Sequence, residues 1–280
     1  MKGQGSLMKR FHQSFALLAM LAAAAVASAQ DNGERITASF SDASRPGLLH
    51  VALITGTITV KAGQGKDVII QARGRGDRRD GDSEAPPMGM RRLAQQPSVS
   101  VEERNNRMEI SAASGMVAVD LEIQVPARTN LQLSTVNNGD VNVEGIEGEL
   151  EIGNVNGSIT LKSVSGSVVA HTVNGKVLAD LTRITPQKPM AFTSLNGVVD
   201  ITLPPSIKAN LKLRTDNGSV YTDFELKALS QSVPVVEDTR SSGGRYRVEV
   251  NRVIYGSVNG GGPDVEMRTF NGNIYVRKGA

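Results

Sequence analysis

The sequence predicts an all-β fold, a β-solenoid in which short strands stack on one another and turn at Asn-Gly corners. Glycine returns every nine residues between Val136 and Asp180. The residues two and four places after each glycine are aliphatic, which is the alternation of a half-buried strand. Asparagine precedes glycine on alternate units, so an 18-residue double unit is also present. A strand and a corner copied end to end indicate a stacked β architecture.

A third aliphatic residue, seven places after each of the first four glycines, distinguishes between two possible architectures. In an antiparallel β-meander or sandwich, Asn-Gly would be a hairpin turn, and the seventh residue would face away from the second and fourth. A second bend lets all three face one core, which favours the solenoid and keeps the meander as the alternative. We expect Ile152 and Leu161 inside, and Glu149, Glu151 and Lys162 outside. The aliphatic triplets are Val141, Val143 and Ile146; Leu150, Ile152 and Val155; Ile159, Leu161 and Val164; and Val168, Ala170 and Val173.

The corner residues are interpreted as structural turn residues and not as ligand-binding residues. Glycine suits a corner that needs positive φ or has no room for a Cβ atom. Asparagine amides that stack in register can form a hydrogen-bonded ladder. The predicted turn residues are Asn138, Gly139, Gly148, Asn156, Gly157, Gly166, Asn174, Gly175, Asn196, Gly197, Asn217, Gly218, Asn271 and Gly272.

The first 29 residues have the pattern of a secretory signal peptide. Lys9 and Arg10 precede the apolar run from Phe15 to Val26, and the small residues 27–29 form a cleavage site. Removing these residues takes three bases from the 31 in the chain, which leaves 28 against 28 acids. A formal charge of zero argues against nucleic acid as a partner. The chain has no cysteine, so it has neither disulfides nor a lipid anchor on cysteine.

The mature chain divides into an N-terminal β region, 30–125, and a repeat region, 126–280, which we expect to be continuous. Residues 36–71 read as strands and turns, the first irregular coils of the same architecture. Residues 73–97 combine arginines, acids, glycines and a Pro-Pro pair, which predicts a disordered loop. The Arg-Gly-Asp tripeptide at 75–77 is interpreted as a chance match within it. Residues 98–110 predict a hairpin that turns at Asn105-Asn106, followed by a strand that ends at Pro126.

Beyond Asp180 the repeat continues at wider spacing. Asn-Gly recurs at 196–197, 217–218 and 271–272, and insertions at 182–189 and around 204–205 supply the extra length. Insertions of this kind usually form loops on one side of a stack. Residues 221–245 form a less regular excursion, with one helical turn expected near 224–229.

Three motifs carry a resemblance to a known family: residues 121–126 leading through 131–135 to 138–141, residues 201–204 leading to 217–220, and residues 269–274. Over about residues 115–278 the chain resembles a bacterial β-strand-repeat family of unknown function whose members are labelled as adhesins. The resemblance implies an exported β-helix-like domain. It supplies no catalytic residues to carry over.

The sequence offers little chemistry, and we predict no catalytic residue, cofactor or metal. His50 and His171 stand alone, without the spacing of a metal site. An outward acidic cluster is expected at Asp140, Glu144, Glu147, Glu149 and Glu151. It is the one feature that a polysaccharide-acting enzyme could use. Such enzymes usually bind sugars on aromatic side chains, however, and this chain has only four tyrosines and no tryptophan.

We therefore expect an exported, non-enzymatic scaffold or adhesin-like module, periplasmic or at the cell surface. It would bind a protein or glycan of the cell envelope and would not span the membrane after signal cleavage. An envelope-associated regulatory or sensory partner that uses the long loops is the alternative, and a polysaccharide-acting enzyme is the second alternative.

Overall fold

The computed structural model describes residues 34–75, 98–112, 118–230, 235–238, 240, 244, 246–249 and 253–279. The chain separates into two units, Met1–Asn32 and Gly33–Ala280, and the first lies wholly outside the described residues. The predicted signal peptide and residues 76–97 of the predicted loop also lie outside them. Every described strand belongs to the second unit.

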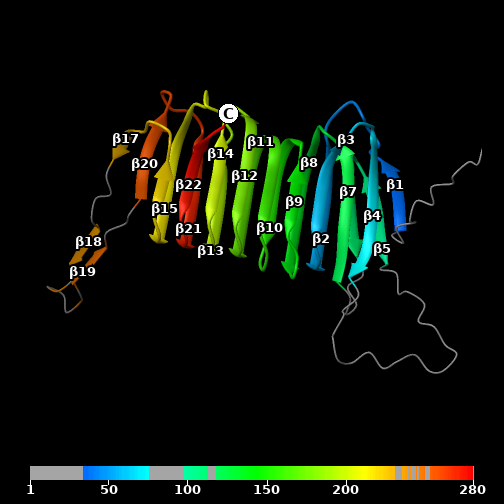
Figure 1. Ribbon diagram of the computed structural model, residues 1–280, viewed down its shortest axis with the longest axis horizontal. Helices are drawn as coiled ribbons and strands as arrows, with labels where there is room; N and C mark the ends of the chain where they lie inside the picture. The colour runs from blue at the N-terminus through cyan, green and yellow to red at the C-terminus, as the bar shows by residue number, and fades with distance from the viewer. Residues whose placement is uncertain are drawn as a thin grey trace, which may run out of the picture. The chain divides into compact units, whose positions relative to one another are not determined.

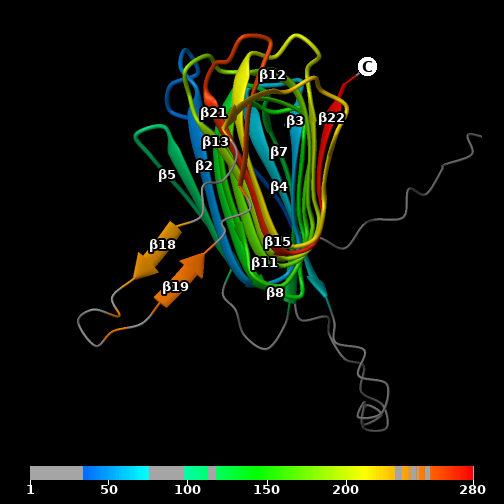
Figure 2. The same cartoon turned by 90° about the vertical axis from the view of Figure 1, so that its left-hand side faces the viewer.

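Twenty strands of the described chain form one continuous sheet that folds over into two facing layers (Figures 1 and 2). We call the layers sheet I and sheet II. In spatial order, sheet I contains β5 (Val99–Arg104), β6 (Arg107–Ala112), β2 (Gly47–Thr55), β8 (Thr129–Asn137), β10 (Glu147–Asn154), the second half of β11 (Ile159–Asn174), β13 (Met190–Asn196), β21 (Asp264–Asn271), β15 (Ala209–Asn217), β20 (Val253–Val258) and β17 (Lys227–Ser230).

Sheet II is ordered in the same direction along the stack. It contains β1 (Glu34–Ser39), β4 (Asp67–Arg75), β7 (Ala118–Pro126), β3 (Ile58–Gly63), β9 (Val141–Glu144), the first half of β11, β12 (Val177–Ile184), β14 (Val199–Leu203), β22 (Ile274–Lys278) and β16 (Val220–Thr222). A separate antiparallel pair is formed by β18 (Val235–Asp238) and β19 (Tyr246–Glu249).

Each regular coil consists of one strand of sheet I, a corner glycine and one strand of sheet II. The nine-residue unit of the sequence is therefore half a coil. Successive coils pair in parallel and in register: Leu150 lies beside Leu131 on one side and Val168 on the other. This confirms the predicted β-solenoid, and the parallel pairing excludes an antiparallel meander for these coils.

The core lies between the two sheets and is almost entirely aliphatic. Ile152 and Leu161 are buried as predicted, and so are Ile146 and Val164. The prediction was wrong for Val155 and Val173, which are only half-buried. In sheet I the strand continues to the corner without a second bend, so its alternation buries the sixth residue after the glycine, and the seventh faces out.

Two coils lie out of sequence order in the stack. The coil of β2 and β3 is inserted between β6–β7 and β8–β9. The coil of β21 and β22, the last in the chain, is inserted between β13–β14 and β15–β16. Figure 1 shows both insertions: blue β2 lies beside green β8, and the red strands lie between β13–β14 and yellow β15.

Antiparallel strands complete both ends of the stack. At one end β4 and β1 continue sheet II, and the predicted hairpin of β5 and β6 turns at Asn105 and Asn106, both with positive φ. At the other end β20 and β17 continue sheet I. These strands differ from parallel neighbours in their hydrogen-bond pattern and interrupt the repeat at the exposed edges.

Two local predictions were wrong. Residues 73–75 were expected to belong to a loop, but Arg73 and Arg75 belong to β4 and pair with the carboxylates of Glu122 and Asp120 on β7. The helical turn expected near 224–229 is absent from these described residues. The backbone there enters β17, which pairs with β20.

Candidate functional site

The corner glycines form a column in which a side chain has no room. A Cβ atom on Gly157 would lie 2.0 Å from the carbonyl oxygen of Gly139, and one on Gly175 would lie 2.1 Å from that of Gly157. Neither Gly157 nor Gly175 has positive φ. Close approach of backbones, not left-handed geometry, therefore requires glycine here. The same contact links Gly139 to Gly56, Gly197 to Gly175, Gly272 to Gly197 and Gly218 to Gly272.

An asparagine ladder lies beside this column. Each amide nitrogen donates to the amide oxygen of the asparagine one coil away, as the stacking argument anticipates. The bonds run from Asn156 to Asn137 (3.1 Å), Asn174 to Asn156 (2.9 Å), Asn196 to Asn174 (2.9 Å), Asn271 to Asn196 (2.7 Å) and Asn217 to Asn271 (2.9 Å). In the first of these coils Asn137 occupies the ladder position. Asn138 takes positive φ at the corner instead.

A column of buried polar side chains, which the repeat pattern did not predict, forms hydrogen bonds to the glycine carbonyl oxygens. Two residues before each ladder asparagine, a side chain points inward and donates to the glycine carbonyl of the neighbouring coil. The bonds are Thr135 to Gly56 (2.9 Å), Asn154 to Gly139 (2.9 Å), Thr172 to Gly157 (2.8 Å), Ser194 to Gly175 (2.8 Å), Thr269 to Gly197 (2.8 Å) and Thr215 to Gly272 (2.8 Å). The recurrence of a small polar residue at this one place was the signal available.

Gly148 and Gly166 lie at the opposite edge of the stack. There the chain leaves sheet II and begins the next strand of sheet I. Gly166 has φ of +125°, and a Cβ atom on it would lie 1.9 Å from the carbonyl oxygen of Gly148. This edge therefore has its own tight corner, without an asparagine ladder.

Only three members of the predicted acidic cluster lie together. Glu147, Glu149 and Glu151 belong to sheet I, whereas Glu144 belongs to sheet II and Asp140 lies at the Asn-Gly corner. Each of the three on sheet I has a nearby partner: Arg183 at 3.4 Å from Glu147, Lys188 against Glu149, and the Gln132 amide at 3.3 Å from Glu151. The stack divides the cluster because successive nine-residue units go to different sheets.

The two histidines of the described residues lie apart. His171 is exposed on sheet I above Gly153, and His50 is half-buried with its Nδ1 3.5 Å from Oε1 of Glu109. Within the described ranges, no three His, Asp or Glu side chains come together as metal ligands would.

The most conspicuous surface feature is an apolar stripe on sheet I, next to the asparagine ladder. Its members occupy one position in six consecutive coils: Ile54, Val136, Val155, Val173, Leu195 and Phe270. Four of them, Ile54, Val136, Leu195 and Phe270, are 40–57% exposed. Five steps of about 4.8 Å between strands make the stripe roughly 24 Å long.

Small and polar residues flank most of the stripe. On one side lies the asparagine ladder. On the other side lie Ala52, Ser134, Gly153, His171 and Thr193. Arg268 on β21 continues this row, and Asp216 on β15 lies beside Phe270. A contiguous exposed apolar surface bordered by polar groups is typical of an interaction site.

Sheet II presents a contrasting polar face. Arg277 makes two hydrogen bonds to Asp200, of 2.7 and 2.9 Å, and these raise the pKa of Arg277. Tyr221 and Tyr275 stack nearby, with ring centroids 5.1 Å apart.

Comparison with known proteins gives one family. The family model described as Toastrack DUF4097 matches residues 96–276. No curated protein matches the chain. The part of the chain that the structure describes contains no helix long and apolar enough to cross a membrane.

Three solved structures are similar to the chain at low scores. A putative cell adhesion protein from Clostridium sporogenes is 12% identical, with a TM-score of 0.41, over 88% of this chain and 100% of its own. A putative adhesin from Bacteroides fragilis is 11% identical, with a TM-score of 0.34, over 89% and 97%. A third, from Parabacteroides merdae, is 7% identical, with a TM-score of 0.24, over 90% and 98%. These scores carry no argument about function.

Proposed function

Because the chain belongs to the Toastrack DUF4097 family, a family without an assigned activity, we propose its function from its own surface. The protein is an exported, non-enzymatic binding module of the cell envelope. It holds a protein partner along the apolar stripe of sheet I.

The single observation behind this proposal is that six consecutive coils present an apolar side chain outward at one position. An isolated exposed Val or Leu needs no explanation, but a continuous line does. The members come from chain positions as distant as Ile54 and Phe270, so no single local segment accounts for the line.

The chemistry of the stripe favours a protein over a glycan. Five of its six side chains are aliphatic, and Phe270 is the one aromatic ring. Aliphatic side chains bury well against the apolar side chains of another protein. The mostly small and polar flanks favour a partner surface with little charge, because a buried unpaired charge is costly.

Export rests on the N-terminal pattern of Lys9, Arg10, the apolar run and the small residues 27–29. The non-enzymatic role rests on the contacts that the acidic residues of sheet I already make. A polysaccharide-acting enzyme would need two carboxylates on opposite sides of one bond, and the three on sheet I already contact Arg183, Lys188 and Gln132.

Photo-crosslinking in the cells that make the protein tests the proposal. A photoreactive amino acid replaces Leu195 in the stripe, and in a matched variant it replaces Thr160, which faces outward on sheet II. We expect one discrete crosslinked protein from Leu195 and none from Thr160. Adding Phe270→Asp, on the neighbouring coil, should reduce the Leu195 product severalfold, because it places a charge in the contact.

Equal products at both positions, or none at Leu195, would contradict the proposal. A product that joins two copies of this chain would assign the stripe to self-association instead. Deleting residues 76–97, while keeping Arg73 and Arg75 in β4, should leave the Leu195 product unchanged. Its loss would favour the alternative of a regulatory partner that uses the long loops.

A further inference from the structure

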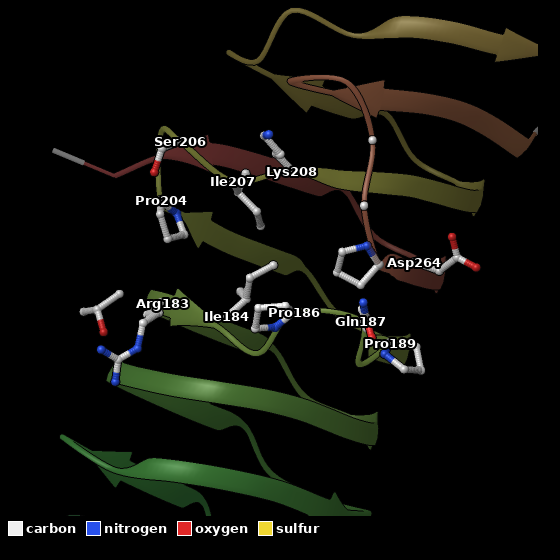
Figure 3. A pocket seen from close by; sticks show the side chains of 14 residues that line it. Arg183, Ile184, Pro186, Gln187, Pro189, Pro204, Ser206, Ile207, Lys208 and Asp264 are labelled. Carbon is white, nitrogen blue, oxygen red and sulfur yellow. The ribbon is translucent and has the colours of Figure 1, made fainter.

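Three connections between coils meet at the edge of the stack opposite the asparagine ladder. They are residues 185–189 after β12, residues 204–208 after β14 and residues 259–263 after β20. They line an open pocket of about 750 Å³, which we call the loop cavity (Figure 3). Ligand sites in proteins usually occupy roughly 300–1,000 Å³.

The out-of-order coil creates this site. Because β21 is inserted between β13 and β15, the segment that precedes β21 lies among the segments that precede β13 and β15. The Asn259 amide donates to the carbonyls of Ile207 (2.8 Å) and Pro205 (3.1 Å), and the Asn210 amide donates to that of Gly262 (2.9 Å). These bonds hold the loops together before any ligand arrives, which lowers the entropic cost of binding.

The lining is apolar and stiff. Four prolines contribute to it, and their rings fix φ in each loop. In Figure 3, Ile184 and Ile207 point toward each other across the cavity. Ile207 is buried, and Ile184 packs against the core while part of it stays exposed. The proline residues of the lining are Pro186, Pro189, Pro204 and Pro263.

Two cationic side chains belong to the lining: Arg183 precedes Ile184, and Lys208 follows Ile207 and in Figure 3 leaves its strand on the opposite side from Ile207. Arg183 is 3.4 Å from Glu147, and both groups are largely exposed, so this pair is weak. The one carboxylate of the lining, Asp264, accepts a hydrogen bond of 3.2 Å from the Asn210 amide. Figure 3 shows it directed away from the two isoleucines. The charged residues of the lining are therefore two cations and one carboxylate.

We propose that the loop cavity binds a small amphipathic carboxylate. Its apolar body lies between Ile184 and Ile207, and its carboxylate lies at Lys208. The prolines lie against the body, and the ammonium group supplies a charge-assisted hydrogen bond to the carboxylate. The site is independent of the apolar stripe, at the opposite edge of the stack.

Binding of sodium octanoate to the full mature chain tests the proposal, with the isoleucine methyl groups labelled for NMR. Octanol and octylammonium have the same apolar body with a neutral and a cationic head. We expect octanoate to shift the Ile184 and Ile207 methyl signals at saturable concentrations, and to leave Ile152, in the middle of the core, unchanged. Octanol should bind about tenfold more weakly, since it lacks the charge, and octylammonium should not bind.

Lys208→Glu should weaken octanoate binding about tenfold or more, and the milder Lys208→Gln should lie between it and the natural protein. Lys176→Glu, an equal charge change at the ladder edge, is the control and should bind as the natural protein does. The proposal is overturned if the Ile184 and Ile207 signals do not move, if octanol binds as well as octanoate, or if Lys208→Glu and Lys176→Glu bind alike.

Discussion

The coils in the middle of the stack and the strands at its two ends are held in place by different contacts. From β8 to β14 each coil follows the last in sequence and repeats three contacts: the glycine column, the asparagine ladder and the buried polar side chain on a glycine carbonyl. At the N-terminal end the strands are antiparallel, and individual side chains make the ties, as where the Ser41 hydroxyl donates to Glu103 (2.9 Å).

This difference follows from the physics of a stack. An inner coil buries both of its flanks against near-copies of itself, so one set of contacts can serve every coil. A terminal coil has one unpaired flank, which must be covered by something of different shape. Regular contacts should therefore matter most in the middle, and the same change should cost less at an end.

The largest effect is expected from a charge in the middle of the core. Ile152→Asp places a carboxylate where no water or partner reaches, which should destabilise the protein by about 4 kcal/mol or more. Its neighbour Glu151 faces out, so Glu151→Ala should change stability by less than about 0.5 kcal/mol. Chemical denaturation measures both, and equal effects would reverse the assignment of faces.

The second-largest loss of stability is expected in the glycine column. Gly157→Ala drives a Cβ atom against the Gly139 carbonyl and should cost about 1–3 kcal/mol as the coils separate. Gly65 lies in a turn near the N-terminal end, where a Cβ atom would come no closer than 3.8 Å to its nearest neighbour. Gly65→Ala should therefore be neutral within about 0.5 kcal/mol. Equal melting temperatures for the two variants would contradict the claim that glycine matters more in the middle of the stack than at its end.

The asparagine ladder should show a smaller, graded effect. Asn174→Ala removes hydrogen bonds to both Asn156 and Asn196 and should cost about 1 kcal/mol. Asn217 stands at the end of the ladder with a single bond, to Asn271, so Asn217→Ala should cost about half as much. Thermal unfolding of the two variants, measured side by side, tests whether the loss of stability is proportional to the number of ladder bonds removed. A larger loss at Asn217 would show that it is not.

The smallest effect concerns acid and the N-terminal end. The Ser41 hydroxyl, together with the backbone amides of Ser41 and Asn106, lowers the pKa of Glu103 below its ordinary 4.5. A lowered pKa in the folded state gives stability that is present above pH 4.5 and is lost as the pH falls through the folded pKa. The Glu103→Gln variant should thus have a lower melting temperature than the natural protein at neutral pH, and this gap in melting temperature should close on acidification. A gap that stays constant with pH would remove Glu103 as its cause.

The sequence predicted the regular part of this fold well because its signals are local. Alternation placed Ile152 and Leu161 inside, and glycine spacing located the corners. The same local reasoning was wrong for Val155 and Val173, since it could not tell which half of each coil contains the second bend. Those two residues belong to the apolar stripe, so the error concealed the candidate binding surface.

The periodicity of the chain by itself determined a stacked β architecture, its inner and outer faces and the hydrogen-bonding asparagines. Only the tertiary structure decided the order of the coils, the division of the acidic residues between two sheets, and the meeting of three loops around Ile184 and Ile207. The physical reason is that parallel strands pair through backbone groups common to all residues. Coils of similar shape can therefore stack in several orders, and contacts between residues as distant as Asn196 and Asn271 settle which one forms.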